Sequence, residues 1–285
     1  MGRAVGRCQR ALNSHAAMLR GSAPWVLVLA DLVAGLCDVG YSSLVRPRAS
    51  APGRSFDDTP EETMTVADPL PAIDAVRREL EIDEQILEGT RRVRAILTLT
   101  TSLDPAPAQL WPLLTRPGEL AEWFGPVAGD LHEGGAFIAP RGAHGRVLVS
   151  QEPHRLSLTW ADGGDEGTLT LRLDPEDDGS TLLVLRHSAL LDAEEFERTG
   201  PGVIALRWEV VLLALAARTS GWDSSCLLEA PVPSPDWLRS PEGRAHLRSW
   251  SVRWAAAAVA AGVGERVARR GEDGAVEAFL TALGG

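Results

Sequence analysis

The spacing of apolar residues changes along the middle of the chain from a helical repeat to strict alternation. Leu110, Trp111 and Leu114 recur at intervals of three and four residues, which predicts a short helix that Pro117 ends. From Val127 onward, apolar residues occupy every second position in short runs separated by glycine, proline and aspartate. Such runs are typical of strands joined by tight turns, so this stretch predicts an antiparallel sheet made of consecutive hairpins.

Seven strands are predicted in this region. The first precedes the short helix, and the other six follow a second short helix, Gly118–Phe124. The predicted strands are Val93–Thr101, Val127–Leu131, Ala136–Pro140, Arg146–Gln151, Arg155–Trp160, Thr168–Asp174 and Ser180–His187. In the last three strands one face is apolar, formed by Leu156, Leu158, Trp160, Leu169, Leu171, Leu173, Leu183, Leu185 and His187. That face is expected to be buried and the opposite face solvated.

Helices are predicted on either side of the sheet. Asp104 and Pro105 supply an N-cap and a first helical residue for the short helix. A separate helix is predicted over Leu70–Leu87, whose apolar residues have roughly helical spacing. Pro201–Arg218 is apolar almost all round, which predicts a helix buried on more than one side. We expect this long helix to lie in the concave face of the sheet.

Two further helical stripes follow the long helix. One begins at Ser240, the N-cap before Pro241, and ends at Gly262, and a last short helix carries Val276 and Phe279. The apolar faces of both helices are expected to pack onto the sheet and the long helix, and a homodimer interface is the alternative.

The chain divides into four predicted segments: 1–63, 64–92, 93–230 and 231–285. The first is a basic leader, since residues 1–54 contain seven arginines against two aspartates. It is interpreted as disordered or as an upstream extension before Met64, with a signal or anchor and a structured element as alternatives. The second is a helical segment, the third contains the sheet and the long helix, and the fourth is a helical extension.

Composition excludes several classes of protein. The formal net charge of −11 argues against a nucleic-acid binder. The apolar run in the leader is shorter than a membrane span, so none is predicted. Three cysteines without a Cys-x-x-Cys or Cys/His cluster indicate neither disulfide bonds nor zinc, and they favour a reducing cytoplasm. No nucleotide-binding or nucleophile-elbow motif is present, and no metal or cofactor is predicted.

A series of short motifs resembles a known superfamily. In order they are Thr-Arg-Pro-Gly-Glu-Leu (115–120), Glu-Trp-Phe-Gly-Pro (122–126), Gly-Asp-Leu (129–131), Gly-Gly (134–135), the strand ending at Trp160, and His187. Together they resemble the SRPBCC (START-like, helix-grip) superfamily over about Val93–Gly221. More narrowly, they are similar to the bacterial branch related to the activator of heat-shock-protein-90 ATPase. The resemblance implies an α+β helix-grip fold, with about seven antiparallel strands curved around a C-terminal helix and a cavity between them. It implies no fixed chemistry.

Large apolar side chains are expected where the sheet meets the helices. The predicted ligand-binding residues are Trp123, Phe124, Phe137, Trp160, Leu171, Leu185, His187, Trp208 and Leu212. For any single aromatic residue, core packing is the favoured interpretation and lining a ligand cavity is the alternative. Tryptophans suit a pocket that is apolar in bulk with a few directing donors.

His187 is the titratable group with the most informative position, because it shares the inward register of Leu183 and Leu185. The favoured interpretation is a buried, neutral histidine bonded to backbone or to the first helix. Donation to a ligand carbonyl and general acid–base catalysis are the alternatives.

Three functions remain open. The favoured one is binding of a small hydrophobic or amphipathic molecule in the cavity without a reaction, the second is a polyketide cyclase/dehydratase-like enzyme, and the third is a chaperone-ATPase-activator-like interaction module. Two or more titratable side chains converging in the cavity would favour the enzyme, and His187 alone would favour the binder.

Overall fold

A computed structural model describes residues 73–219, 221–222 and 230–284, so the predicted leader lies outside the described residues. The strands are β1 (Arg77–Leu87), β2 (Thr90–Leu103), β3 (Ala128–Gly129), β4 (Ala136–Ile138), β5 (His144–Gln151), β6 (Arg155–Trp160), β7 (Gly167–Pro175) and β8 (Thr181–Asp192). The helices include α4 (Pro107–Thr115), α5 (Pro117–Trp123), the 3₁₀ turn η1 (Pro140–Gly142), α6 (Ala193–Thr199), α7 (Gly202–Arg218), α8 (Pro235–Arg239), α9 (Pro241–Ala260) and α10 (Glu265–Gly284).

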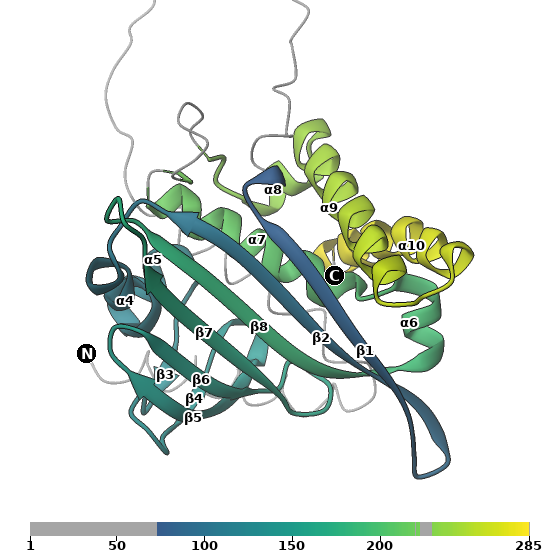
Figure 1. Ribbon diagram of the computed structural model, residues 1–285, viewed down its shortest axis with the longest axis horizontal. Helices are drawn as coiled ribbons and strands as arrows, with labels where there is room; N and C mark the ends of the chain where they lie inside the picture. The colour runs from purple at the N-terminus through teal and green to yellow at the C-terminus, as the bar shows by residue number, and fades with distance from the viewer. Residues whose placement is uncertain (1–72, 220, 223–229, 285) are drawn as a thin grey trace, which may run out of the picture.

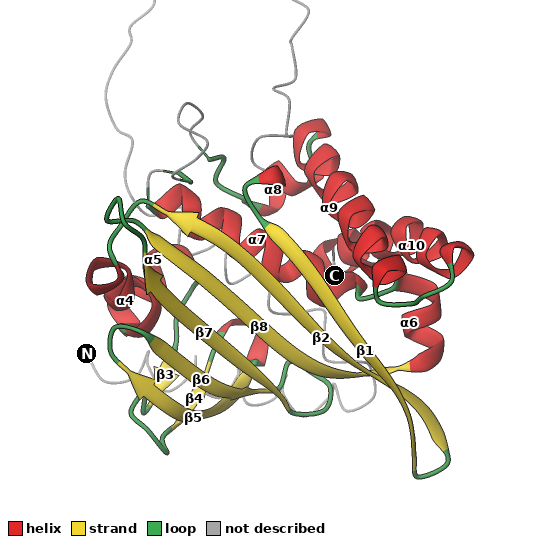
Figure 2. Cartoon of the chain, viewed as in Figure 1, coloured by secondary structure: helices red, strands yellow, loops and turns green. Residues whose placement is uncertain are grey.

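The described strands form one eight-stranded antiparallel sheet in the order β1-β2-β8-β7-β6-β5-β4-β3. From β3 to β8, neighbours in the sheet are also neighbours in sequence, as expected for consecutive hairpins. The helix α7 lies across one face of the curved sheet, and α9 and α10 gather beyond its β1 edge (Figures 1 and 2). The predicted α+β helix-grip fold is confirmed, with one strand more than the seven expected.

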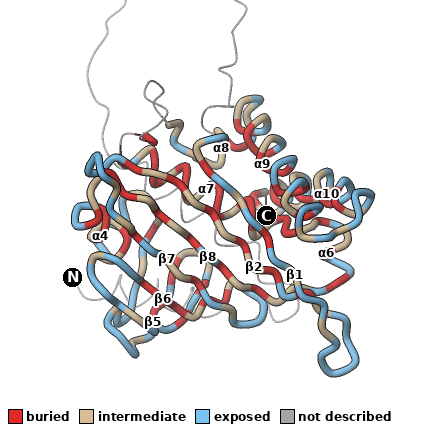
Figure 3. Tube along the Cα trace, in the orientation of Figure 1, coloured by how far each residue is buried: buried red, intermediate tan, exposed pale blue. Residues whose placement is uncertain are grey.

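The face of the sheet toward α7 is the apolar one. Along β8, Leu183, Leu185 and His187 are buried, while Arg186 between them is exposed. Figure 3 shows the same alternation of buried and more exposed positions along the neighbouring strands. Period-two burial is what a sheet with one covered face requires, and it confirms the sequence interpretation of the last three strands.

The extra strand corrects the prediction of a helix over Leu70–Leu87. Arg77–Leu87 is strand β1, which pairs along its whole length with β2, for example Leu80 opposite Leu97. The two strands are joined by Glu88 and Gly89, both with positive φ, the backbone required by a two-residue hairpin turn. Pairing with β2 satisfies every backbone group on one side of the segment, and this outweighs its weak helical spacing.

Some helix limits also differ from the predictions. The first helix begins at Pro107 with Ala106 as its N-cap, two residues beyond the predicted start at Pro105. Strand β8 continues past His187 to Asp192, whose side chain accepts hydrogen bonds from the backbone N–H groups of Glu194 and Glu195 and so starts α6, a helix that was not predicted.

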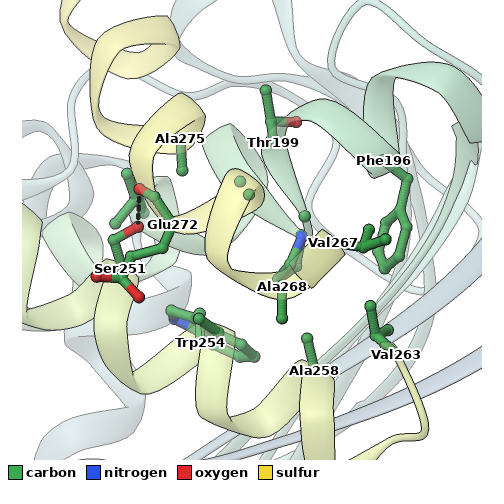
Figure 4. A pocket seen from close by; sticks show the side chains of 16 residues that line it. Phe196, Thr199, Ser251, Trp254, Ala258, Val263, Val267, Ala268, Glu272 and Ala275 are labelled. Carbon is green, nitrogen blue, oxygen red and sulfur yellow. Dashed lines mark hydrogen bonds between the residues drawn. The ribbon is translucent and has the colours of Figure 1, made fainter. Parts of the chain in front are cut away.

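The C-terminal helices pack onto the body, as expected. The helix α9 contacts β1 and α7, and α10 contacts α6, α7 and α9. Figure 4 shows the small gap where these helices meet, with the Ser251 hydroxyl donating to the backbone oxygen of Glu272 at 2.7 Å. The volume of this gap is only about 10 Å³, so it is a small packing defect between helices and has no room for a ligand.

A buried ion pair joins β1, α7 and α9. The Glu209 carboxylate accepts from Arg78 Nε at 2.5 Å and from Arg78 Nη2 at 2.9 Å, and Trp254 Nε1 also donates to it at 2.8 Å. The side chains of Arg78 and Glu209 are 5% and 1% exposed. Because the Glu209 side chain is buried, its carboxylate is held by partners from two other elements, β1 and α9, rather than by water.

No single helix in the described part of the chain is long and apolar enough to cross a membrane, although α6 and α7 together pass by length and composition with a 59° bend between them.

Candidate ligand-binding site

An apolar cavity of about 100 Å³ lies between the sheet and α7. Its walls come from β4–β8, from α4 and α5 at one end, and from α7 along its length. Eight of the nine predicted residues line it: Trp123, Phe124, Phe137, Trp160, Leu171, Leu185, Trp208 and Leu212. Thr115 is the one lining residue with a polar side chain besides the tryptophans. Inward-facing alternation along β6, β7 and β8 supplies three of these residues, and the others come from β4, from α5 and the residue after it, and from α7.

Aromatic rings form a continuous row through the site. The ring centroids are 5.9 Å apart for Phe137 and Trp160, 5.6 Å for Trp160 and Trp208, and 5.5 Å for Trp208 and His187. Outside this row, Trp123 Nε1 donates to the backbone oxygen of Leu113 at 3.0 Å. Tilted and edge-on contacts at these distances are favourable, so the row is a rigid wall.

His187 bonds to Trp208, which corrects the expectation of a partner in the backbone or the first helix. Trp208 Nε1 donates to His187 Nδ1 at 2.8 Å. An indole N–H is a donor only, so His187 Nδ1 must accept, and the neutral ring carries its proton on Nε2. Burial lowers the pKa of His187 to about 4, although the Asp162 carboxylate opposes this. The ring is therefore neutral at pH 7, as the sequence analysis predicted.

A second space, of about 190 Å³, adjoins the cavity, and we call it the polar cleft because charged side chains lie among its apolar lining residues. His187 lines this cleft rather than the cavity. Five residues line both spaces: Trp123, Phe124, Trp160, Trp208 and Val211. In the cleft, Asp162 accepts from Arg207 Nη1 at 2.5 Å and from Arg141 Nη2 at 3.4 Å. A wider hollow of about 480 Å³ shares these three charged residues and reaches α8 and α10. The site therefore consists of an apolar cavity and an adjoining cleft that contains charged side chains.

Sequence reasoning missed the charged residues of this cleft, which are Arg141, Asp162, Asp165 and Arg207. They come from η1, from the turn after β6 and from α7. One signal could have found Arg207, because it is one of only three charged residues in the apolar segment Pro201–Arg218. A charge inside such a helix needs a partner, and here the partner is Asp162.

The buried state of His187 predicts a dependence of stability on pH. Unfolding restores the ordinary pKa of 6.5, so the unfolded chain binds a proton between pH 6.5 and 4 that the folded chain does not. The contribution of the buried, neutral His187 to the free energy of unfolding is fully present above pH 6.5. We expect that free energy to fall by about 3 kcal/mol as the pH drops to 4. Urea unfolding of the wild type and of His187→Asn, whose side-chain oxygen is bonded to Cγ as Nδ1 is and can still accept from Trp208, should diverge in this window.

The difference between the two proteins isolates His187, because His246, whose pKa burial also lowers, is present in both. Parallel stability profiles from pH 7 to pH 4 would contradict a desolvated His187.

The fold and its interior cavity define a helix-grip protein. Residues 104–219 match the family described as "Activator of Hsp90 ATPase homolog 1-like protein". Over these residues, which are less than half of the chain, the protein is similar to that family. No curated protein matches the sequence significantly.

Several solved structures are similar. The crystal structure of CalU16 from Micromonospora echinospora is 23% identical, with a TM-score of 0.44, and the alignment covers 65% of this chain and 99% of that one. Its solution structure is 26% identical, with a TM-score of 0.47 and coverage of 65% and 97%. An HSP90 activator from Plasmodium falciparum is 23% identical, with a TM-score of 0.31 and coverage of 32% and 71%.

Proposed function

We propose that this protein binds a small apolar or amphipathic molecule in the cavity between its sheet and α7. The observation that carries the proposal is an interior space of about 100 Å³ lined almost entirely by apolar side chains and adjoining a polar cleft. Ligand sites are commonly concave, mostly apolar and furnished with a few polar groups that orient the ligand. Apolar interior cavities also tend to stay dry, so an apolar ligand displaces little bound water.

An enzymatic role is the second candidate, and one observation favours it. His187 and Asp162 both line the cleft, which meets the criterion of two titratable side chains at one site. Asp162, however, already accepts from two arginines. A histidine whose pKa is about 4 is a weak base at neutral pH, far from the value that suits a general base. These features support binding over proton transfer.

The description of the matching family raises a third candidate, a protein-interaction role toward a chaperone ATPase. The cavity supports this role less than ligand binding, because Leu185, Leu212 and most other residues of its wall are buried within the fold.

The neutral probe N-phenyl-1-naphthylamine tests the proposal. It should bind with enhanced fluorescence across the cavity and the adjoining cleft, because its two ring systems need more room than the cavity alone. Leu171→Phe, which adds volume to the cavity wall, should weaken its affinity about tenfold because overfilling such a space costs about 1–3 kcal/mol. The matched control is Val184→Phe, since Val184 is half-buried on β8 and lines none of these spaces. Equal probe affinities for wild type and a folded Leu171→Phe protein would place binding elsewhere.

A further inference from the structure

Around Asp162, the polar cleft has more cationic than anionic groups. Two guanidinium groups, from Arg141 and Arg207, converge on the single carboxylate of Asp162. The other acidic residue lining the cleft, Asp165, already pairs with Arg92. The local group formed by the two arginines and Asp162 therefore carries one net positive charge.

One buried donor at the cleft has no acceptor among the described residues. The Nε of Arg141 is buried and donates to nothing among the described residues. The bond from Trp208 places the proton of neutral His187 on Nε2, which makes this atom a second donor at the cleft. A buried donor without a partner costs free energy, so Arg141 Nε favours an acceptor supplied from outside the chain.

The backbone at Arg141 is held in a conformation that its side chain does not favour. Its φ and ψ are 62° and 23°, in the left-handed region, within η1. A hydrogen bond from Ala139 N to Ala143 O at 2.7 Å closes this turn and holds the residue there. Strained non-glycine residues tend to occur at binding sites, because the surrounding structure maintains a geometry that function requires.

Arg207 reaches the cleft from α7 in a largely dehydrated setting. Its side chain is 21% exposed, and burial lowers the pKa of the guanidinium while Asp162 opposes that change. In such surroundings an attraction between opposite charges is stronger than in water. A second anion beside Arg207 would stabilise its charge in the same way that Asp162 does.

We propose that the cleft binds the anionic end of the ligand, a carboxylate, sulfonate or similar oxyanion, whose apolar body occupies the cavity. This inference rests on the proposed function. It assigns Arg141 and Arg207 as ion-pair partners and His187 as a hydrogen-bond donor through Nε2. Trp160 and Trp208, which line both spaces, would lie against the junction between body and head.

Two fluorescent probes with the same aromatic framework test the inference. N-phenyl-1-naphthylamine is neutral, and 8-anilinonaphthalene-1-sulfonate adds one sulfonate. The quantity to compare is the ratio of the neutral probe's Kd to the anionic probe's Kd, because it cancels changes in the apolar cavity. Arg141→Gln should lower this ratio about fivefold, as expected for one partly exposed charge pair of about 1 kcal/mol. Asp162→Asn, which removes the competing carboxylate, should raise it by a similar factor.

The control is Arg155→Gln, which removes an exposed arginine on β6 that lines neither the cavity nor the cleft and should leave the ratio unchanged. A ratio unchanged in both Arg141→Gln and Asp162→Asn, with neutral-probe binding still sensitive to Leu171→Phe, would overturn the anionic head and leave the cavity proposal standing. Equal losses in Arg141→Gln and Arg155→Gln would also overturn it, since they indicate attraction to overall charge. Failure of both probes to bind the folded wild type would reject the proposed function and this inference with it.

Discussion

Replacement of Glu209 by leucine is expected to lower the free energy of unfolding by about 3–5 kcal/mol, because it leaves the guanidinium of Arg78 charged and unpaired in the interior. The exposed fraction of the Arg78 side chain is only 5%, so water cannot replace the lost carboxylate. Trp254 Nε1 loses its acceptor in the same variant. The measurement is the midpoint of urea unfolding, followed by tryptophan fluorescence.

The double variant Arg78→Met/Glu209→Leu is the control that separates charge from packing. Apolar side chains of similar volume in place of both partners remove the unpaired charge, and such replacements are often neutral in stability. We expect the double variant to regain most of the loss. If Glu209→Leu alone unfolds at the wild-type urea concentration, the ion pair does not hold β1, α7 and α9 together.

Trp160→Ala is expected to destabilise the fold by about 3–5 kcal/mol and to abolish binding of the neutral probe. The ring is 8% exposed and lies between Phe137 and Trp208 in the wall shared by the cavity and the cleft. Its removal leaves a hole and takes away the flat surface against which the probe would lie. Stability is measured by thermal unfolding and binding by probe fluorescence below the melting range.

The matched control is Trp250→Ala. Trp250 is 2% exposed but lies on α9, away from the cavity walls. We expect a comparable loss of stability with probe affinity retained. Probe binding that survives Trp160→Ala and disappears in Trp250→Ala would move the binding site to the C-terminal helices.

Most of the sheet and of the cavity wall could be predicted from local patterns of apolar and polar residues. Alternation along a strand determines which side chains share a face, so Leu171 and Leu185 could be placed together without knowledge of the fold. The apolar segment that forms α7 could be assigned to the covered face by the same argument, since an apolar helix requires burial. Eight of the nine selected residues therefore line one cavity.

The errors arose where partners distant in sequence decide the structure. Arg77–Leu87 carries a helical spacing weak enough for pairing with β2 to override it. His187 was placed correctly on its strand, but its hydrogen-bond partner depends on how α7 lies across the sheet.

The sequence by itself determined a curved antiparallel sheet, a long apolar helix across it and an aromatic interior, because periodicity and turn residues act over a few neighbouring positions. Only the tertiary structure decided the polar half of the site. Asp162 and Arg207 are 45 residues apart in the chain, and Arg141 belongs to a third segment. Their meeting depends on the angle at which α7 crosses the sheet and on the fold of η1. That arrangement minimises the free energy of the whole packed core, so no local pattern encodes it.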